Sequence, residues 1–218
     1  MTGYLKICRQ VGWSLVVIGV IDIAFMFYCV THEMSYSSSL NIFAVVAGIL
    51  LLRGSLGTVR VVTWFSVFMF TGLFLCSILV FPWIRPMDYW LFSFQKNPLG
   101  SLSSIVIAAA LLFWLFWIYK KLRSPAVVEA RASAGQRAGV PRSSFLAGSL
   151  LAILMTVFMH LSLKGDSAEK AIHLASQQYG TQYRYFVSSI SWSGDYVYAQ
   201  LTAYNDEGSK EVRIEWEE

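Results

Sequence analysis

The run VGWSLVVIGVIDIAFMFYCV, from Val11 to Val30, is a continuous apolar stretch with one carboxylate, Asp22, near its middle. A helix needs about 20 apolar residues to cross the hydrocarbon core of a bilayer, and this run has that length. Backbone groups in lipid must bond within their own segment, so we expect a transmembrane helix. Lys6 and Arg9 precede the run, but no small-residue cleavage site follows it, which favours a retained helix over a signal peptide.

The composition of the whole chain is that of a membrane protein. Of its 218 residues, 56% are hydrophobic and 14% are charged, whereas soluble domains carry roughly a quarter charged residues. The polar sequence SYSSSLN leads into the second of five apolar windows, so a re-entrant segment is the alternative there to a short span. The five expected spans are 11–31, 37–53, 61–83, 102–119 and 144–163.

The basic residues set the expected orientation. If the N-terminus is cytoplasmic, ten basic residues fall on that side, and the short outer loops hold only Arg85 and Lys96. This asymmetry follows the positive-inside rule, and five spans then put the C-terminus in the periplasm of a bacterium. The ten residues are Lys6, Arg9, Arg53, Arg60, Lys120, Lys121, Arg123, Arg131, Arg137 and Arg142.

These features divide the chain into four expected parts. Residues 1–120 are a four-helix transmembrane region, 121–143 a flexible basic cytoplasmic linker, 144–163 the fifth transmembrane helix and 164–218 an extracytoplasmic domain. The linker is expected to determine topology, with attraction to anionic lipid headgroups as the alternative. The predicted fold class is an all-α membrane bundle of about five helices plus a small C-terminal α+β domain.

Residues 164–218 have the pattern of a small soluble fold. Apolar residues at helical spacing end at Gly180, and three strand-like runs follow, separated by the turn sequences WSG and NDEG. Alternating apolar residues give the second and third runs one apolar face, which predicts one helix on a three-stranded antiparallel meander. On the polar face, Tyr196 and Tyr198 are a candidate surface for peptide or glycan, with ordinary strand formation as the alternative. Five basic and nine acidic residues exclude nucleic acid as the partner of this domain.

Asp22 is the main candidate polar group in the membrane. It shares a helical stripe with two glycines, and the second window offers a matching stripe that includes Asn41 and Gly48, so these helices are expected to pack together. Desolvation should keep Asp22 protonated as a structural hydrogen-bond donor, and a proton or ion site is the alternative. His160 is the only histidine within a span and lies at a different depth.

The sequence contains no recognisable enzyme motif. THEMSY has a tyrosine where the H-E-x-x-H zinc motif needs its second histidine, and no glycine-rich phosphate loop occurs. We therefore expect no catalytic residue, no cofactor and no metal. The aromatic loop that contains Trp90 is expected in the outer headgroup interface, with a lining for a hydrophobic ligand as the alternative.

The runs MSYSSSLNIFAVVAGILLLRGSL and VRVVTWFSVFMFTGLF resemble small multi-pass inner-membrane proteins of proteobacteria, over about residues 1–125. The resemblance implies a bacterial inner membrane and brings no catalytic residue with it. We predict a non-catalytic protein that presents a periplasmic interaction or assembly domain. Its surroundings are the lipid bilayer, and its partner through residues 164–218 is a membrane protein or a second copy. The alternatives are a transport or sensing protein that uses Asp22, and a membrane enzyme that acts on a lipidic substrate.

Overall fold

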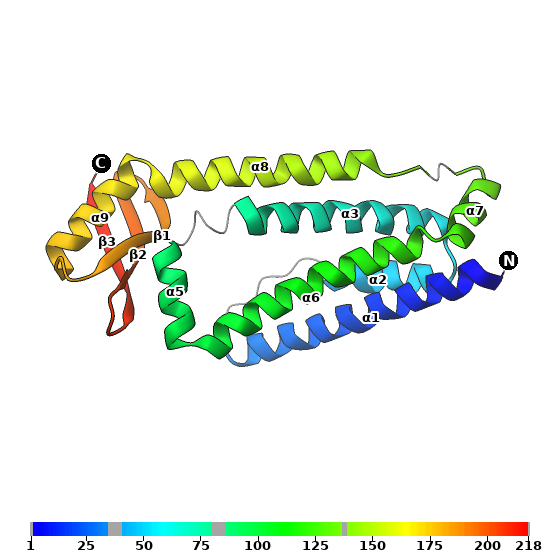
Figure 1. Cartoon of the computed structure of the whole chain (residues 1–218), viewed down its shortest axis with the longest axis horizontal. Helices are drawn as coiled ribbons and strands as arrows, with labels where there is room; N and C mark the ends of the chain where they lie inside the picture. The colour runs from blue at the N-terminus through cyan, green and yellow to red at the C-terminus, as the bar shows by residue number, and fades with distance from the viewer. Residues whose placement is uncertain (1, 35–40, 80–85, 137–138, 218) are drawn as a thin grey trace. The chain divides into compact units, whose positions relative to one another are not determined.

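The structure of the protein is a computed structural model that describes residues 2–34, 41–79, 86–136 and 139–217 (Figure 1). The chain forms two compact units, Met1–Phe70 with Leu111–Gly148 and Thr71–Ala110 with Ser149–Glu218. The described helices are α1 (Thr2–Thr31), α2 (Asn41–Leu52), α3 (Leu56–Leu79), α5 (Met87–Lys96), α6 (Pro98–Leu122), α7 (Pro125–Ser133), α8 (Arg142–Lys164) and α9 (Asp166–Tyr179). The described strands are β1 (Arg184–Ser193), β2 (Tyr196–Tyr204) and β3 (Ser209–Glu217).

Four of the described helices are long and apolar enough to cross a membrane. They are α1, α3, α6 and α8, and each has 23 or more residues. The expected count of five spans is not confirmed, because the second window forms α2, which has 12 residues. At 1.5 Å per residue such a helix is about 18 Å long, against about 30 Å of hydrocarbon. Residues 37–40 of that window lie outside the described residues.

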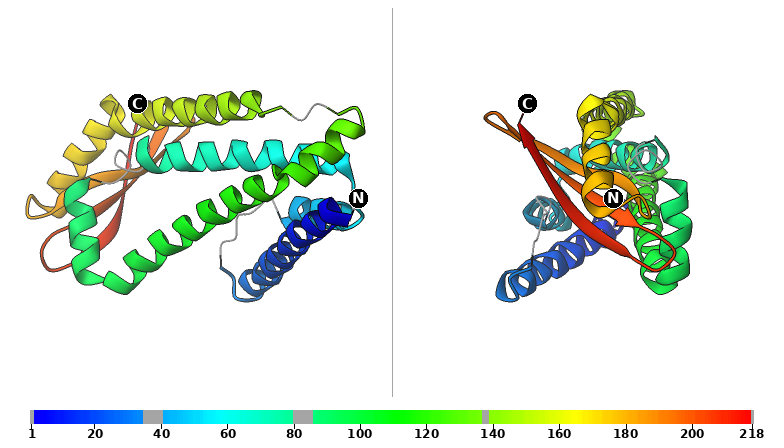
Figure 2. Two further views of the ribbon diagram at one scale, coloured as in Figure 1. Left: turned by 45° about the vertical axis from the view of Figure 1, so that its right-hand side comes forward. Right: turned by 90° about the vertical axis from the view of Figure 1, so that its left-hand side faces the viewer.

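α2 packs antiparallel against the N-terminal half of α1 (Figure 2). The two backbones touch at a pair of glycines, since a Cβ added to Gly48 would lie 2.8 Å from the Gly12 carbonyl oxygen. A Cβ added to Gly54 would meet the Leu5 side chain, so the end of α2 returns the chain to the start of α1. Small residues are the usual means by which membrane helices approach this closely.

The stripe of α1 predicted to pack against protein is the less exposed face of that helix. Its members are buried (Gly12, Leu15, Gly19, Cys29) or half-buried (Asp22, Met26). On the other side of the helix, Ile21 and Phe25 are 62% and 52% exposed. Helical spacing in the sequence therefore identified the packing face of α1 correctly.

The starts of α1 and α3 and the end of α6 meet at one end of the first unit. A single buried cluster joins them with the end of α2 and with α7, and its members include Cys8, Leu51, Val59, Leu122 and Val127. The start of α8 lies at this end too, because Trp64 Nε1 on α3 donates a hydrogen bond to Ser143 Oγ at 3.0 Å. The described basic residues expected on the cytoplasmic side all belong to these helix ends and their connections, and Arg137 lies outside the described residues.

The stretch 121–143 differs from the flexible linker that its composition predicts. α7 occupies its middle and begins with Pro125, a position at which the missing amide donor costs nothing. Val127 is fully buried, and a Cβ on Gly3 of α1 would lie 3.7 Å from the Ala126 Cβ. The apolar residues of α7 fix this part of the stretch to the helix bundle.

The C-terminal residues form one helix on a three-stranded antiparallel meander, as the sequence predicts. The strand order is β1-β2-β3, and α9 lies across one face of the sheet (Figure 2). Leu201 in the central strand pairs with Val187 and Val212, and all three are buried with Ala171 of α9. The apolar alternation of β2 and β3 therefore selects the face that α9 covers.

Gly48→Ala should destabilise the protein, because the new methyl group would have to displace the backbone of α1 at Gly12 and Val16. Overpacking of this kind typically costs about 1–3 kcal/mol. Gly57→Ala in α3 is the matched control, since a Cβ there would meet nothing closer than Ser55 Oγ at 3.9 Å. Thermal unfolding in detergent compares the variants, and equal melting temperatures would contradict a tight α1–α2 contact.

Candidate functional site

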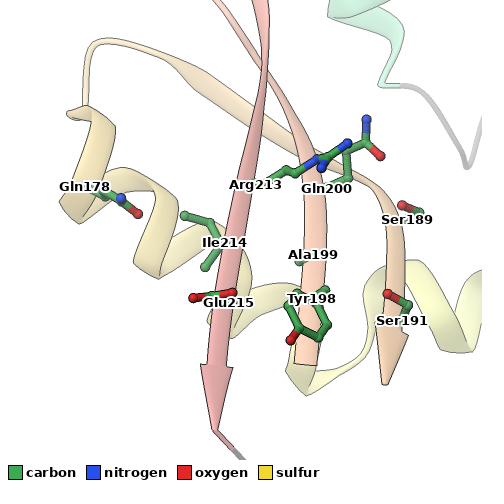
Figure 3. Close-up of a pocket in the computed structure, with 9 residues that line it drawn as sticks. All are labelled: Gln178, Ser189, Ser191, Tyr198, Ala199, Gln200, Arg213, Ile214 and Glu215. Carbon is green, nitrogen blue, oxygen red and sulfur yellow. The ribbon is translucent and has the colours of Figure 1, made fainter. Parts of the chain in front are cut away.

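The face of the sheet opposite α9 carries polar residues from all three strands. Across the sheet, one row contains Ser189, Gln200 and Arg213, and the next contains Ser191, Tyr198 and Glu215. These six residues line an open hollow of about 710 Å³ together with three residues from the side of the sheet that α9 covers, Gln178, Ala199 and Ile214 (Figure 3). Figure 3 shows the Arg213 side chain extending toward Gln200, and Tyr198 between Glu215 and Ser191.

The hollow offers hydrogen-bonding groups around an exposed ring. Tyr198 is 43% exposed, and its neighbour on the same face, Tyr196, is 48% exposed. Gln200 Nε2 donates to Glu211 Oε2 at 2.9 Å, which orients the amide. Tyrosine and arginine are enriched among the residues that dominate protein–protein binding. The chemistry of this face suits contact with another polypeptide better than the enclosure of a small substrate.

α5 covers the other end of the same face. The ring of Tyr89 packs against Phe186 of β1 and Tyr204 of β2, with centroid distances of 4.8 and 5.2 Å. The ring of Phe92 lies 6.0 Å from that of Tyr204. Phe186 and Tyr204 are 8% and 5% exposed as a result, although they lie on the face that α9 does not cover.

An ion pair accompanies this aromatic contact. Arg184 Nη1 lies 2.9 Å from Asp88 Oδ2, and both side chains are more than half exposed, so the pair is worth at most about 1 kcal/mol. The rings therefore provide most of the attachment of α5. Burial raises the pKa of Tyr204, the Asp88 carboxylate raises it further, and Arg184 lowers it.

The remaining surface of α5 presents apolar side chains. Met87, Leu91 and Phe94 recur at helical spacing and are 70%, 61% and 36% exposed. Trp90 is half-buried, and its ring lies 6.4 Å from that of Phe94. One side of α5 thus binds the sheet, and another has the character of a helix that lies in a headgroup interface.

The other candidates from the sequence lie elsewhere in the chain. Asp22 is half-buried on the packing face of α1, and His160 is exposed on α8. Asn41 begins α2, but its side chain lies outside the described residues. A proton or ion site at Asp22 stays a prediction.

Sequence reasoning missed the contact between α5 and the sheet. Tyr89 and Tyr204 are far apart in the chain, and no local pattern joins them. The density of aromatic residues in 86–97 was the one available signal, and it predicted an interfacial position rather than a docking partner.

The arrangement of histidines, cysteines and acidic residues bears on metal binding. Within 2–34, 41–79, 86–136 and 139–217, no group of three or more His, Cys, Asp or Glu side chains could hold a metal ion. His32 stacks on Tyr28 at 4.1 Å between ring centroids, and its Nδ1 lies 2.9 Å from the Tyr28 carbonyl oxygen. The His32 ring therefore has a local structural contact at the end of α1.

The chain matches no model of a known protein family, no curated protein and no solved structure. The resemblance of residues 1–125 to small inner-membrane proteins of proteobacteria stays a prediction.

Alkaline pH should weaken the contact between α5 and the sheet. An unfolded tyrosine ionises near pH 10, whereas the raised pKa of Tyr204 keeps the folded phenol neutral to higher pH. The free energy of unfolding gained by keeping the Tyr204 phenol neutral is therefore fully present below about pH 10, and it is lost as the pH rises above that value. Tyr204→Phe should reduce the fall in melting temperature between about pH 8 and about pH 10.5.

Tyr198→Phe is the control for this measurement, because it removes the same hydroxyl group from the exposed hollow. Part of the alkaline loss should persist in Tyr204→Phe, since burial also raises the pKa of Tyr185. If the melting temperatures of Tyr204→Phe and Tyr198→Phe fall equally as the pH rises, burial of the Tyr204 phenol does not cause the alkaline loss of stability.

Proposed function

We propose that the protein is a non-catalytic integral membrane protein that presents its C-terminal α+β domain to a protein partner. The observation that carries the proposal is the divided face of the sheet. α5 covers its apolar end at Phe186 and Tyr204, whereas the end with Tyr198 and Arg213 remains open. A small domain that leaves one polar surface open while α9 and α5 cover its apolar surfaces is the arrangement expected of an interaction domain.

The charge of the domain supports a polypeptide as the partner. Residues 164–218 carry five basic and nine acidic residues, a balance that repels nucleic acid. The same balance repels anionic lipid headgroups. A protein segment can combine contact with the Tyr198 ring and a carboxylate opposite Arg213, as the strongest protein contacts commonly do.

The basic end of the first unit supports an orientation with the N-terminus in the bacterial cytoplasm. The starts of α1, α3 and α8 and the end of α6 lie at that end, and basic residues favour the cytoplasmic side. A helix that crosses the bilayer once has its other end on the opposite side. The end of α3, the start of α6 and the end of α8 would therefore lie in the periplasm. α5 connects α3 to α6, so its contact with Arg184 and Tyr204 agrees with a periplasmic domain.

Reporter fusions test the orientation. A reporter that is active only outside the cytoplasm should be active when fused after residue 218. The same reporter should be silent when fused at Ala134, after α7. The reverse pattern would contradict the proposed orientation, and full-length fusion protein detected in both strains is the control for expression.

Photo-crosslinking in cells tests the interaction surface. A photo-reactive phenylalanine analogue at position 198 should give one discrete crosslinked product, and the added Arg213→Ala substitution should reduce it. The same analogue at Gln177, an exposed residue of α9, is the matched control. Equal crosslinking from positions 198 and 177, or no dependence on Arg213, would contradict a specific partner in the hollow.

A further inference from the structure

A cleft of about 320 Å³ lies between α5 and one end of the sheet. Residues of α5 between Asp88 and Lys96 form one wall, and the start of β1 with the β2–β3 turn forms the other. The wall residues Arg184 and Tyr204 are paired across the first two strands, which places the cleft at the end of the sheet that α5 contacts. Small-ligand sites commonly have volumes of roughly 300–1,000 Å³, so the cleft can hold a small polar group.

The cleft is lined by two cationic and two acidic side chains. Arg184 Nη1 lies 2.9 Å from Asp88 Oδ2, so these two charges compensate each other. Lys96 ends α5, and Asp206 belongs to the β2–β3 turn. Within the part of the chain that the structure describes, neither Lys96 nor Asp206 forms an ion pair. The cleft therefore presents one positive and one negative charge that do not compensate each other directly.

Hydrogen bonds within the β2–β3 turn fix the position of Asp206. Asn205 Oδ1 accepts hydrogen bonds from the backbone N–H groups of Glu207 and Gly208, both at 3.0 Å. The Asn205 N–H donates to the Gly208 carbonyl oxygen at 2.9 Å. An asparagine side chain that bonds to the backbone two residues further on stabilises a turn. The acidic side of the cleft is thus built on an ordered loop.

An apolar surface adjoins the charged groups. Leu91 lines the cleft and is 61% exposed, and Met87, one turn earlier on α5, is 70% exposed. A single residue separates α5 from α6, and Ser93 Oγ lies 3.2 Å from Ser101 Oγ across that corner. Because α6 is long and apolar enough to cross a membrane, α5 and its cleft lie next to the end of a candidate span. Lipid headgroups occupy that level of a bilayer.

We propose that this cleft binds the headgroup of a phosphatidylethanolamine, a zwitterionic phospholipid with a primary ammonium group. The lipid phosphate accepts hydrogen bonds from the Lys96 ammonium, and the lipid ammonium donates to the Asp206 carboxylate. An acyl chain of the same lipid lies along Leu91 and Met87. The site goes beyond the proposed function, because it does not include the polar face around Tyr198.

The charges favour a zwitterion over an anionic lipid. A ligand with one negative charge would compensate Lys96 and leave Asp206 uncompensated, whereas a zwitterion compensates both. Residues 164–218 carry five basic and nine acidic residues, and this surplus repels anionic headgroups. A lipid that is neutral overall avoids that repulsion and still offers a phosphate to Lys96.

Lipid titration of the purified full-length protein tests this site. The protein in neutral detergent is titrated with phosphatidylethanolamine, phosphatidylcholine or phosphatidylglycerol, and the melting temperature is followed. Phosphatidylethanolamine should raise it most, because the choline ammonium has no N–H to donate and phosphatidylglycerol has no ammonium. Lys96→Gln and Asp206→Asn should each need about tenfold more phosphatidylethanolamine for the same rise, as expected from loss of one charge-assisted contact. Both residues are exposed, so both variants should fold.

Asp195→Asn and Lys170→Gln are the matched controls and should respond as the wild type does. Asp195 is an exposed aspartate in the β1–β2 turn, and Lys170 is an exposed lysine on α9, and neither lines the cleft. If the control variants lose as much of the response as Lys96→Gln and Asp206→Asn, the effect is diffuse and the site is overturned. An equal or stronger response to phosphatidylcholine or phosphatidylglycerol would overturn the recognition of the ammonium group.

Glycerophosphoethanolamine, the same headgroup without acyl chains, separates a lipid from a soluble ligand. It should raise the melting temperature only at much higher concentration than the intact lipid. An equal rise at equal concentration would overturn the lipid assignment. Crosslinking from position 198 is measured separately, so failure of this site is distinguishable from failure of the proposed function.

Discussion

The close approach of Gly12 and Gly48 determines how the first unit is assembled. Because no side chain separates the two backbones, a helix of 12 residues can pack along α1 and bring the chain back to the start of that helix. α3 then begins beside α1, and the end of α6 and α7 complete the same buried cluster. The position of every basic connection at this end, Arg131 included, follows from that return of the chain.

In the second unit, the aromatic contact between α5 and the sheet determines how the C-terminal domain completes its core. One helix and three short strands enclose a small core, and α9 contributes mainly alanines to it, namely Ala168, Ala171 and Ala175. The rings of Tyr89, Phe186 and Tyr204 extend the buried apolar surface to the second face of the sheet. Since α5 leads directly into the apolar helix α6, the domain is attached by this contact as well as by its covalent link to α8.

Local sequence patterns predict the secondary structure and its packing faces. They do not predict contacts between residues that lie far apart in the chain. Alternation around Leu201 and helical spacing around Asp22 each identify a packing face, because the periods of strand and helix are fixed by backbone geometry. The burial of Arg131 and the pairing of Tyr89 with Tyr204 depend on which elements meet, and hydrophobic periodicity carries no such information. The sequence indicated the shortness of α2 only in part. The polar residues before Asn41 already made the second apolar window the weakest candidate for a transmembrane span.

The first unit and the C-terminal domain differ in charge in a way that fits the proposed interaction surface. Residues 1–70 and 111–148 hold ten basic and three acidic residues, whereas residues 164–218 hold five basic and nine acidic residues. Anionic headgroups attract the first set and repel the second, so electrostatics alone would hold the C-terminal domain away from the lipid. The exposed apolar side of α5, at Met87 and Leu91, opposes that repulsion with a contact that is insensitive to charge. In the proposed arrangement, α5 would hold the domain near the membrane while the headgroups repel it, which would leave its polar face, with Tyr198 and Arg213, accessible to another protein.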